Sequence, residues 1–363
     1  MNVNFVALFM SCFAMLALVD RLIGNRFGLG KELERGFYLF GNMALSMLGM
    51  IVISPLLADL MSPLFDFFAN TLKLDPSIIP ASLFANDMGG APLSTEVALD
   101  SKIGMFNALV VSSMMGCTIS FTIPYAINNV DAKCHKEMLV GFLCGIITIP
   151  IGCFVAGLVS GIHIVALLLN LLPLFIFALI ISIGLLLKPM LCVKIFSIFG
   201  KIINIIIMIG LGLGILEFLI GIRPIKGLTD YKDAAMICVN AATVMSGAFP
   251  FVFILSKILN KPMKKLGNKL NINEVSALGF VSNLATSVTT FENMKNMDTK
   301  GIVLNSAFAI SAAFTFAGHL AFTLAFDANY IFPVIIGKLI AGVTSLLVAT
   351  LIYKRVFKNQ ENS

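Results

Sequence analysis

Tryptophan is absent from this chain of 363 residues, and only 12% of its residues are charged. A soluble protein carries about a quarter charged residues, so the composition excludes an ordinary soluble enzyme or binding domain. Long apolar runs recur along the whole chain, and the mean hydropathy is +0.98. These features predict an all-α polytopic membrane protein that is embedded in the lipid bilayer.

Histidine is scarce as well, and the seven cysteines show no paired spacing. Most of the cysteines lie within apolar runs and are interpreted as small buried hydrophobic residues, which argues against a disulfide framework. The HExxH, G-x-S-x-G and Walker A patterns are all missing. The sequence therefore predicts that the protein is not an enzyme, holds no metal or cofactor, and binds no nucleic acid.

Eleven helical segments are expected, because a membrane span needs about 20 mainly apolar residues. Nine qualify as full spans: 3–24, 36–60, 103–125, 138–160, 163–187, 201–221, 233–256, 301–326 and 331–353. Two more, 76–98 and 273–293, have a similar length but are interrupted by polar residues. These two are predicted to be re-entrant or broken segments.

The two interrupted segments share a pattern. It is A-x-x-F-x-x-D-x8-E at Ala81, Phe84, Asp87 and Glu96, and A-x-x-F-x-x-N-x8-E at Ala277, Phe280, Asn283 and Glu292. At the same shift of 196 residues, Gly141, Leu143 and Thr148 meet Gly337, Leu339 and Thr344. We therefore expect an internal duplication in one membrane domain. Residues 1–162 form the first repeat, 163–200 a linking transmembrane helix and basic loop, and 201–363 the second repeat.

The distribution of lysine and arginine predicts the orientation, since these residues concentrate in cytoplasmic loops. With re-entrant segments and an outside N-terminus, the outer side holds Lys73, Lys102, Arg223, Lys226 and Lys232, and the inner side holds nineteen. If both segments crossed fully, the ratio would be 13 to 11. The C-terminus is therefore expected in the cytoplasm and the two repeats are expected to be inverted, as in many secondary transporters.

Asp87 is the sharpest candidate for function, because a carboxylate at the centre of a membrane helix costs about 2.5–3.5 kcal/mol. We interpret it as an anionic anchor for a cationic substrate or a coupling ion. Beside it, Asn86 and the helix-opening Gly89 and Gly90 are assigned to the same substrate-binding tip. The alternative is that Asp87 caps the following half-helix, and the two interpretations are compatible.

The matching tip supplies amide and hydroxyl groups at Asn283, Thr286 and Ser287. We assign these residues to substrate binding, although Ser and Thr in apolar helices commonly bond their own backbone. Glu96 and Glu292 close the two segments. They are candidates for gating or cation entry, and solvated carboxylates near a membrane face are the alternative.

Two further polar residues fall inside predicted spans. Lys338 is expected to reach a membrane face by snorkelling. His319 could relay protons, but a single histidine more often satisfies a hydrogen bond between helices. In the stretch from Ser112 to Pro124, close packing around Gly116 is favoured over a pore-facing stripe.

The sequence resembles a known family, the ethanolamine permeases of bacterial ethanolamine-utilisation operons (EutH). The resemblance rests on "NDMGG" at Asn86 to Gly90, "SMMGCTISFTIP" at Ser113 to Pro124 and "TIPIGC" at Thr148 to Cys153. It implies uptake of ethanolamine across the bacterial cytoplasmic membrane, which would supply a cobalamin-dependent lyase inside the cell. Asp87 would then suit the ammonium group, and the polar side chains of the second tip would suit the hydroxyl.

Three functions remain open at this stage. The first is a permease for ethanolamine or a similar small cation, working by alternating access around two polar tips. The second is an H⁺- or Na⁺-coupled carrier of another small polar solute, such as an amino acid or nucleoside. The third is a membrane protein without a transport role. Small-residue pairs such as Gly141/Gly145 fit packing within the chain or between copies of a homo-oligomer.

Overall fold

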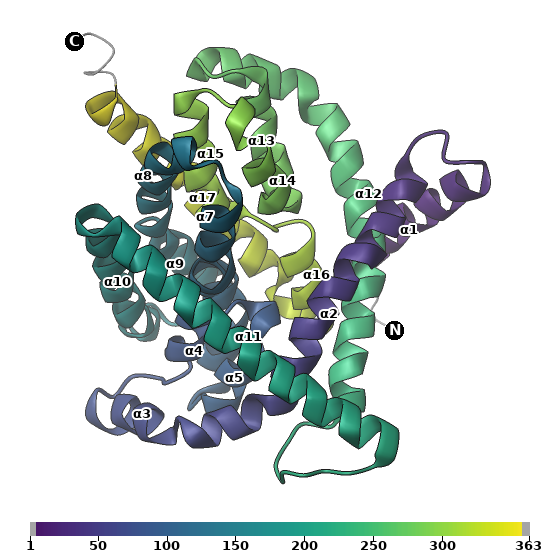
Figure 1. Ribbon diagram of the computed structural model, residues 1–363, viewed down its shortest axis with the longest axis vertical. Coiled ribbons are helices and arrows are strands. Elements are labelled where there is room, and N and C mark those ends of the chain that lie inside the picture. Colours follow the sequence, from purple (N-terminus) through teal and green to yellow (C-terminus); the bar gives the residue numbers. More distant parts are fainter. Residues whose placement is uncertain (1–4, 358–363) are drawn as a thin grey trace.

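The protein is a bundle of α-helices in a computed structural model that describes residues 5–357 (Figure 1). The first half comprises α1 (Phe5–Leu22), α2 (Leu29–Leu60), α3 (Ser62–Asp66), α4 (Ile78–Leu83), α5 (Gly90–Val97), α6 (Ser101–Phe106), α7 (Ile123–Asn129), α8 (His135–Ile146) and α9 (Ile149–Val159). The second half comprises α10 (Ile164–Leu187), α11 (Pro189–Ile220), α12 (Tyr231–Leu270), α13 (Glu274–Ala285), α14 (Ser287–Glu292), α15 (Thr299–Ala312), α16 (Gly318–Phe326) and α17 (Ile331–Val356). The predicted all-α class is confirmed.

Short π- and 3₁₀-helical pieces join several of these helices. The π-helical pieces are η1 (Phe67–Thr71), η3 (Asn107–Gly116) and η4 (Thr118–Thr122), and the 3₁₀ pieces are η2 (Asn86–Met88), η5 (Ala132–Cys134), η6 (Met294–Asn296) and η7 (Ala328–Tyr330). Together α6, η3, η4 and α7 make one continuous apolar helix over 101–129 that is almost entirely buried. It forms the central element of the bundle.

Membrane-crossing helices are fewer than the nine predicted. Within residues 5–357, seven helices are long and apolar enough to cross a bilayer, and an eighth is added if the bent pair Ala44–Leu60 and Ser62–Thr71 counts as one span. The protein is therefore a multi-pass membrane protein. Residues 3 and 4 of the first predicted span, and Lys358 of the predicted inner side, lie outside the described residues.

The predicted span 301–326 is wrong as a single helix. It divides into α15 and α16, separated by an unwound strap at 313–317 in which Phe314 adopts a left-handed φ of 63°. The backbone N–H groups of Phe314 and Phe316 donate to the carbonyls of Asn283 and Leu284, each at 2.9 Å. The chain can unwind here because a second unwound segment, at the end of α13, satisfies the freed groups.

Each interrupted segment forms a helical hairpin whose two ends lie together. The backbone N–H groups of Leu99 and Asp100 both donate to the Asp75 carboxylate at 3.0 Å, which joins the residues before α4 to those after α5. In the second segment, the N–H of Asn273 donates to Asp298 at 2.9 Å and so joins the two ends of the α13–α14 hairpin. Figure 1 shows α4 and α5 toward the lower end of the molecule and α13 and α14 toward the upper end.

The predicted basic loop is helical instead, and a lysine-rich segment further along the chain is helical as well. Residues 189–200, assigned to a loop of the 163–200 linker, form the first turns of α11, and only Lys188 separates α10 from α11. The lysine-rich segment after 256 continues α12 to Leu270. At about 1.5 Å per residue a helix of this length greatly exceeds a hydrocarbon core of about 30 Å. The end of α12 therefore extends beyond the bilayer.

The first hairpin packs closely against the central helix. A Cβ atom on Gly116 would lie 1.9 Å from the carbonyl oxygen of Phe84, so only glycine permits this approach. The Ser120 hydroxyl accepts the N–H of Ala85 at 3.0 Å, next to the tip. Packing around Gly116 is thus confirmed, and it fixes the position of Asp87.

Candidate functional site

Asp87 lies at the tip of the first hairpin, where the 3₁₀ turn η2 separates α4 from α5. Its side chain is partly exposed and lines a cavity of about 90 Å³ between the tip, the central helix and the strap. The lining residues are Ala85, Asp87, Met88, Cys117, Phe121, Phe314, Gly318 and His319. Pockets for drug-sized ligands measure roughly 300–1,000 Å³. This cavity, which we call the central cavity, therefore suits a molecule of only a few heavy atoms.

Lys338 is part of this site, and the expectation that it would snorkel to a membrane face is wrong. The residue lies on α17 and is only 1% exposed. Its ammonium donates to the carbonyl oxygen of Ser113 at 2.6 Å and contacts Nδ1 of His319 at 3.1 Å. The side chain points inward because the carbonyl and the imidazole supply hydrogen-bond partners that a purely apolar surrounding would lack.

His319 connects the lysine to the cavity. The side chain is buried on α16, and its bond to Lys338 joins α16 to α17, as expected for a lone histidine. An ammonium can only donate, so Nδ1 accepts and the proton of a neutral ring lies on Nε2. The ring packs against that of Phe314 at 5.1 Å between centroids, and Phe314 contacts Phe121 at 5.7 Å. Aromatic rings thus form one wall of the central cavity.

The remaining predicted residues of the first tip are tightly enclosed. Gly89 has a φ of 106°, a left-handed conformation that favours glycine, and a Cβ there would lie 2.1 Å from Met50. The N–H of Gly90 donates to the carbonyl of Ala85 at 2.8 Å. Asn86 is fully buried, and neither atom of its amide group has a protein partner. Such unpaired buried groups are rare and commonly mark a place for water or a ligand.

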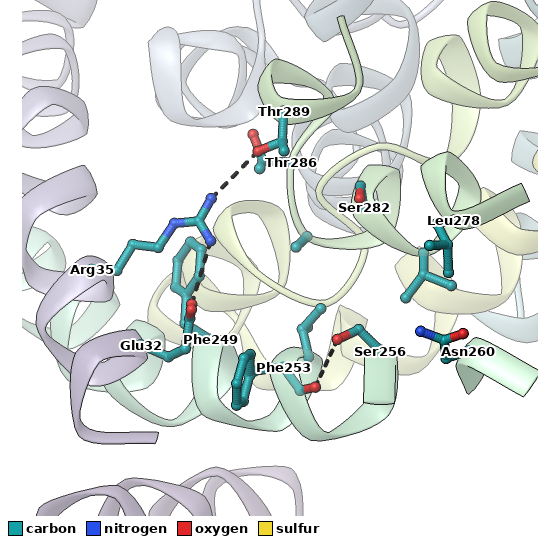
Figure 2. A pocket seen from close by; sticks show the side chains of 13 residues that line it. Glu32, Arg35, Phe249, Phe253, Ser256, Asn260, Leu278, Ser282, Thr286 and Thr289 are labelled. Atoms are coloured by element: carbon teal, nitrogen blue, oxygen red, sulfur yellow. Dashed lines mark hydrogen bonds and ion pairs between the residues drawn. The ribbon is translucent and has the colours of Figure 1, made fainter. Parts of the chain in front are cut away.

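A second, larger cavity of about 270 Å³ opens between α2, α12 and the second hairpin (Figure 2). Its polar lining consists of Glu32, Arg35, Ser256, Asn260, Ser282, Thr286 and Thr289. Arg35 donates to the Thr289 hydroxyl at 3.4 Å and forms an ion pair with Glu32 at the same distance. Its guanidinium also lies 5.6 Å from the centre of the Phe249 ring. This polar cavity, called the vestibule below, borders the lysine-rich end of α12.

The structure does not bring all of the predicted site residues together. Asp87 lines the central cavity, whereas Thr286 lines the vestibule. Asn283 and Ser287 are fully buried. No protein partner hydrogen-bonds to the side-chain oxygen of Asn283 or to the hydroxyl of Ser287. Glu96 and Glu292 are both exposed, near the outer ends of their hairpins.

Sequence reasoning missed two parts of the site. Lys338 was discounted because a lysine within a span can reach either a membrane face or the interior, and only the partners around it decide. The strap was missed because "AAFTFAG" carries no proline and no charged residue. Within the described part of the chain, no group of three or more metal-ligating side chains comes together.

Comparison with known proteins places these features in a family. The family model described as "Ethanolamine utilisation protein, EutH" matches residues 2–352. A relative named "Probable ethanolamine permease EutH" from Listeria monocytogenes serotype 1/2a (strain 10403S) is 41% identical, over 99% of this chain and 97% of its own length. One of the same name from Escherichia coli (strain K12) is 35% identical, over 97% and 96%.

The "Uncharacterized protein YxeR" of Bacillus subtilis (strain 168) is 34% identical, over 96% of this chain and 95% of its own length. No solved structure matches the chain. The match to the family model and the full-length similarity to its relatives agree with the motifs around the first tip. The chain therefore belongs to the EutH family of ethanolamine utilisation proteins.

Proposed function

We propose that the protein is a permease that carries protonated ethanolamine across the bacterial cytoplasmic membrane. The observation that carries this proposal is Asp87, a carboxylate on the tip of a broken hairpin that lines a cavity of about 90 Å³. Ethanolamine has only four heavy atoms and one positive charge, so a small cavity with one carboxylate suits it. The names of the relatives from Listeria and Escherichia coli support the same substrate.

The substrate would be held by three kinds of contact. Asp87 accepts hydrogen bonds from the ammonium group, and charge-assisted bonds of this kind are the stronger ones. The rings of Phe121 and Phe314 offer faces that attract a cation. Nε2–H of His319, left over after Nδ1 accepts from Lys338, donates to the hydroxyl oxygen. Lys338 and the substrate hydroxyl would thus use the two nitrogens of the ring.

Alternating access would work through the two hairpins. Because the ends of each hairpin are tied together, and the hairpins lie toward opposite ends of the molecule, we infer two inverted repeats, 1–162 and 201–363, with re-entrant tips (Figure 1). The vestibule would face the cytoplasm, because it borders the lysine-rich end of α12 and basic residues concentrate on that side of a membrane. Asn283, Thr286 and Ser287 would line the route once the strap moves. Glu96 and Glu292 would stand at its two entrances.

The test is uptake of labelled ethanolamine into liposomes that contain the purified protein. The assay runs at acid pH, because neutral ethanolamine crosses lipid unaided and only the cation needs a carrier. We compare the wild type with Asp87→Asn, which keeps the shape and removes the charge, and with Asp59→Asn, a control at an exposed carboxylate near the end of α2.

The proposal expects uptake by the wild type and by Asp59→Asn. Uptake by Asp87→Asn should fall at least about tenfold, which corresponds to a loss of about 1.4 kcal/mol in the interaction with the substrate. No uptake by folded wild-type protein would exclude ethanolamine as the substrate. Normal uptake by Asp87→Asn would keep the substrate but remove Asp87 from the binding site, and would favour the capping interpretation.

A further inference from the structure

Lys338 is a buried charge beside the central cavity, and in substrate binding as proposed above it has no role beyond its bond to His319. Its side chain is 1% exposed, and its ammonium rests on Ser113 and His319. His319 lines the cavity that Asp87 also lines. The lysine therefore stands directly behind the cavity wall.

Lys338 and Asp87 meet at the same residue: the His319 ring contacts the lysine ammonium at 3.1 Å and lines the cavity that the carboxylate also lines. The described residues include no direct ion pair between the two. A lone charge inside a protein or membrane is far more costly than a pair of opposite charges. The Lys338 ammonium is bonded to Ser113 and His319, whereas Asp87 lines the cavity directly. The carboxylate can therefore bind a second cation on the side that faces the cavity.

We propose that Lys338 is the internal counter-cation of Asp87 and that it sets substrate specificity by rejecting a second positive charge in the central cavity. The specificity part rests on the proposed function, whereas the pairing of the two charges does not. An amino alcohol presents one ammonium to Asp87 and a neutral hydroxyl to His319. A diamine of the same length places a second ammonium at His319, next to the Lys338 ammonium.

The repulsion can be tested on the wild-type protein by competition with labelled ethanolamine uptake at acid pH. The competitors are 1,2-diaminoethane, which carries two ammonium groups there, and n-propylamine, a monoamine of equal chain length. Like charges a few ångströms apart in a partly buried site repel strongly. We expect the diamine to compete at least about tenfold more weakly than the monoamine. Equal competition by the two amines would overturn the specificity role.

Lys338→Gln then shows whether the lysine causes the discrimination. The gap between diamine and monoamine should shrink by about tenfold in this variant, because the fixed positive charge is gone. An unchanged gap in a variant that still carries ethanolamine would assign the discrimination to another group. If the variant does not carry ethanolamine, the two amines are compared instead as competitors for binding of labelled ethanolamine to the purified variant in detergent, with the same two outcomes.

The charge pair is tested without any substrate by a double-mutant cycle on thermal stability in detergent. Asp87→Asn and Lys338→Gln should each lower the melting temperature, and the double variant should be more stable than the sum of the two losses predicts. The control cycle joins Asp87→Asn with Lys102→Gln, since Lys102 also donates to a carbonyl, that of Gly161, but at an exposed site. That cycle should be additive.

Additive losses in the Asp87–Lys338 cycle would overturn the counter-cation role. The result stands whatever the transported solute is, so failure of the pairing and failure of ethanolamine transport are separable. A coupled pair in a protein that carries no ethanolamine would keep Lys338 as the counter-cation and reject only the substrate.

Discussion

The first hairpin depends on one carboxylate at its base, and replacing Asp75 tests this directly. Asp75 accepts four hydrogen bonds: from the N–H and hydroxyl of Ser77 at 3.0 and 2.6 Å, and from the N–H groups of Leu99 and Asp100 at 3.0 Å each. One oxygen serves Ser77 and the other serves the far end of the hairpin. The carboxylate thus closes a loop of 24 to 25 residues.

Asp75→Asn separates these two functions. The amide keeps one oxygen for Ser77 but turns an NH₂ group toward two N–H donors, so both bonds to Leu99 and Asp100 are lost. A hydrogen bond to a charged group contributes about 1.5–3 kcal/mol, and water replaces part of this at the exposed end of the hairpin. We therefore expect a loss of about 2–4 kcal/mol for the two bonds together.

The assay is thermal unfolding of the purified protein in detergent, with Asp59→Asn as the control. Using about 2 °C per kcal/mol, the loss corresponds to a fall of about 4–8 °C in melting temperature. Asp75→Ala, which removes all four bonds, should fall at least as far. A melting temperature for Asp75→Asn within 1 °C of the control would refute the conclusion that this carboxylate holds the hairpin closed.

Two further predictions concern the tip and the orientation. Gly90→Ala should lower both the melting temperature and uptake, because its Cβ would lie 2.2 Å from the carbonyl oxygen of Phe84. The control Gly41→Ala, whose Cβ would have nothing within 4 Å, should change neither. Equal effects of the two substitutions would contradict the close packing at the tip. Glu96→Cys should react with a membrane-impermeant thiol reagent added outside the cell, and Glu292→Cys with the reagent added on the cytoplasmic side. Labelling of whole cells and of inverted vesicles measures the two reactions. Labelling of both cysteines from one side would contradict the opposed hairpins.

Much of the architecture could be predicted from the sequence, because hydropathy and charge act over whole segments. Apart from 301–326, which divides into α15 and α16, the predicted spans fall on helical segments, and the two interrupted segments are the two hairpins. Both segments break as predicted, although Asp87 lies at the first break, whereas Asn283 lies within α13 and the second break falls at Thr286. The ends of the two hairpins carry the acidic and amide side chains whose hydrogen bonds join each hairpin at its base.

The class of protein, the segments that break and the carboxylate at the first tip thus follow from the order of the amino acids. The inward direction of Lys338, the unwound strap and the separate cavities of Thr286 and Asp87 depend on how distant helices pack. The physical reason is the same in each case. A polar group inside a membrane protein goes wherever a hydrogen-bond partner is available, and these partners lie on helices distant in sequence: Ser113 for Lys338, and Asn283 for Phe314.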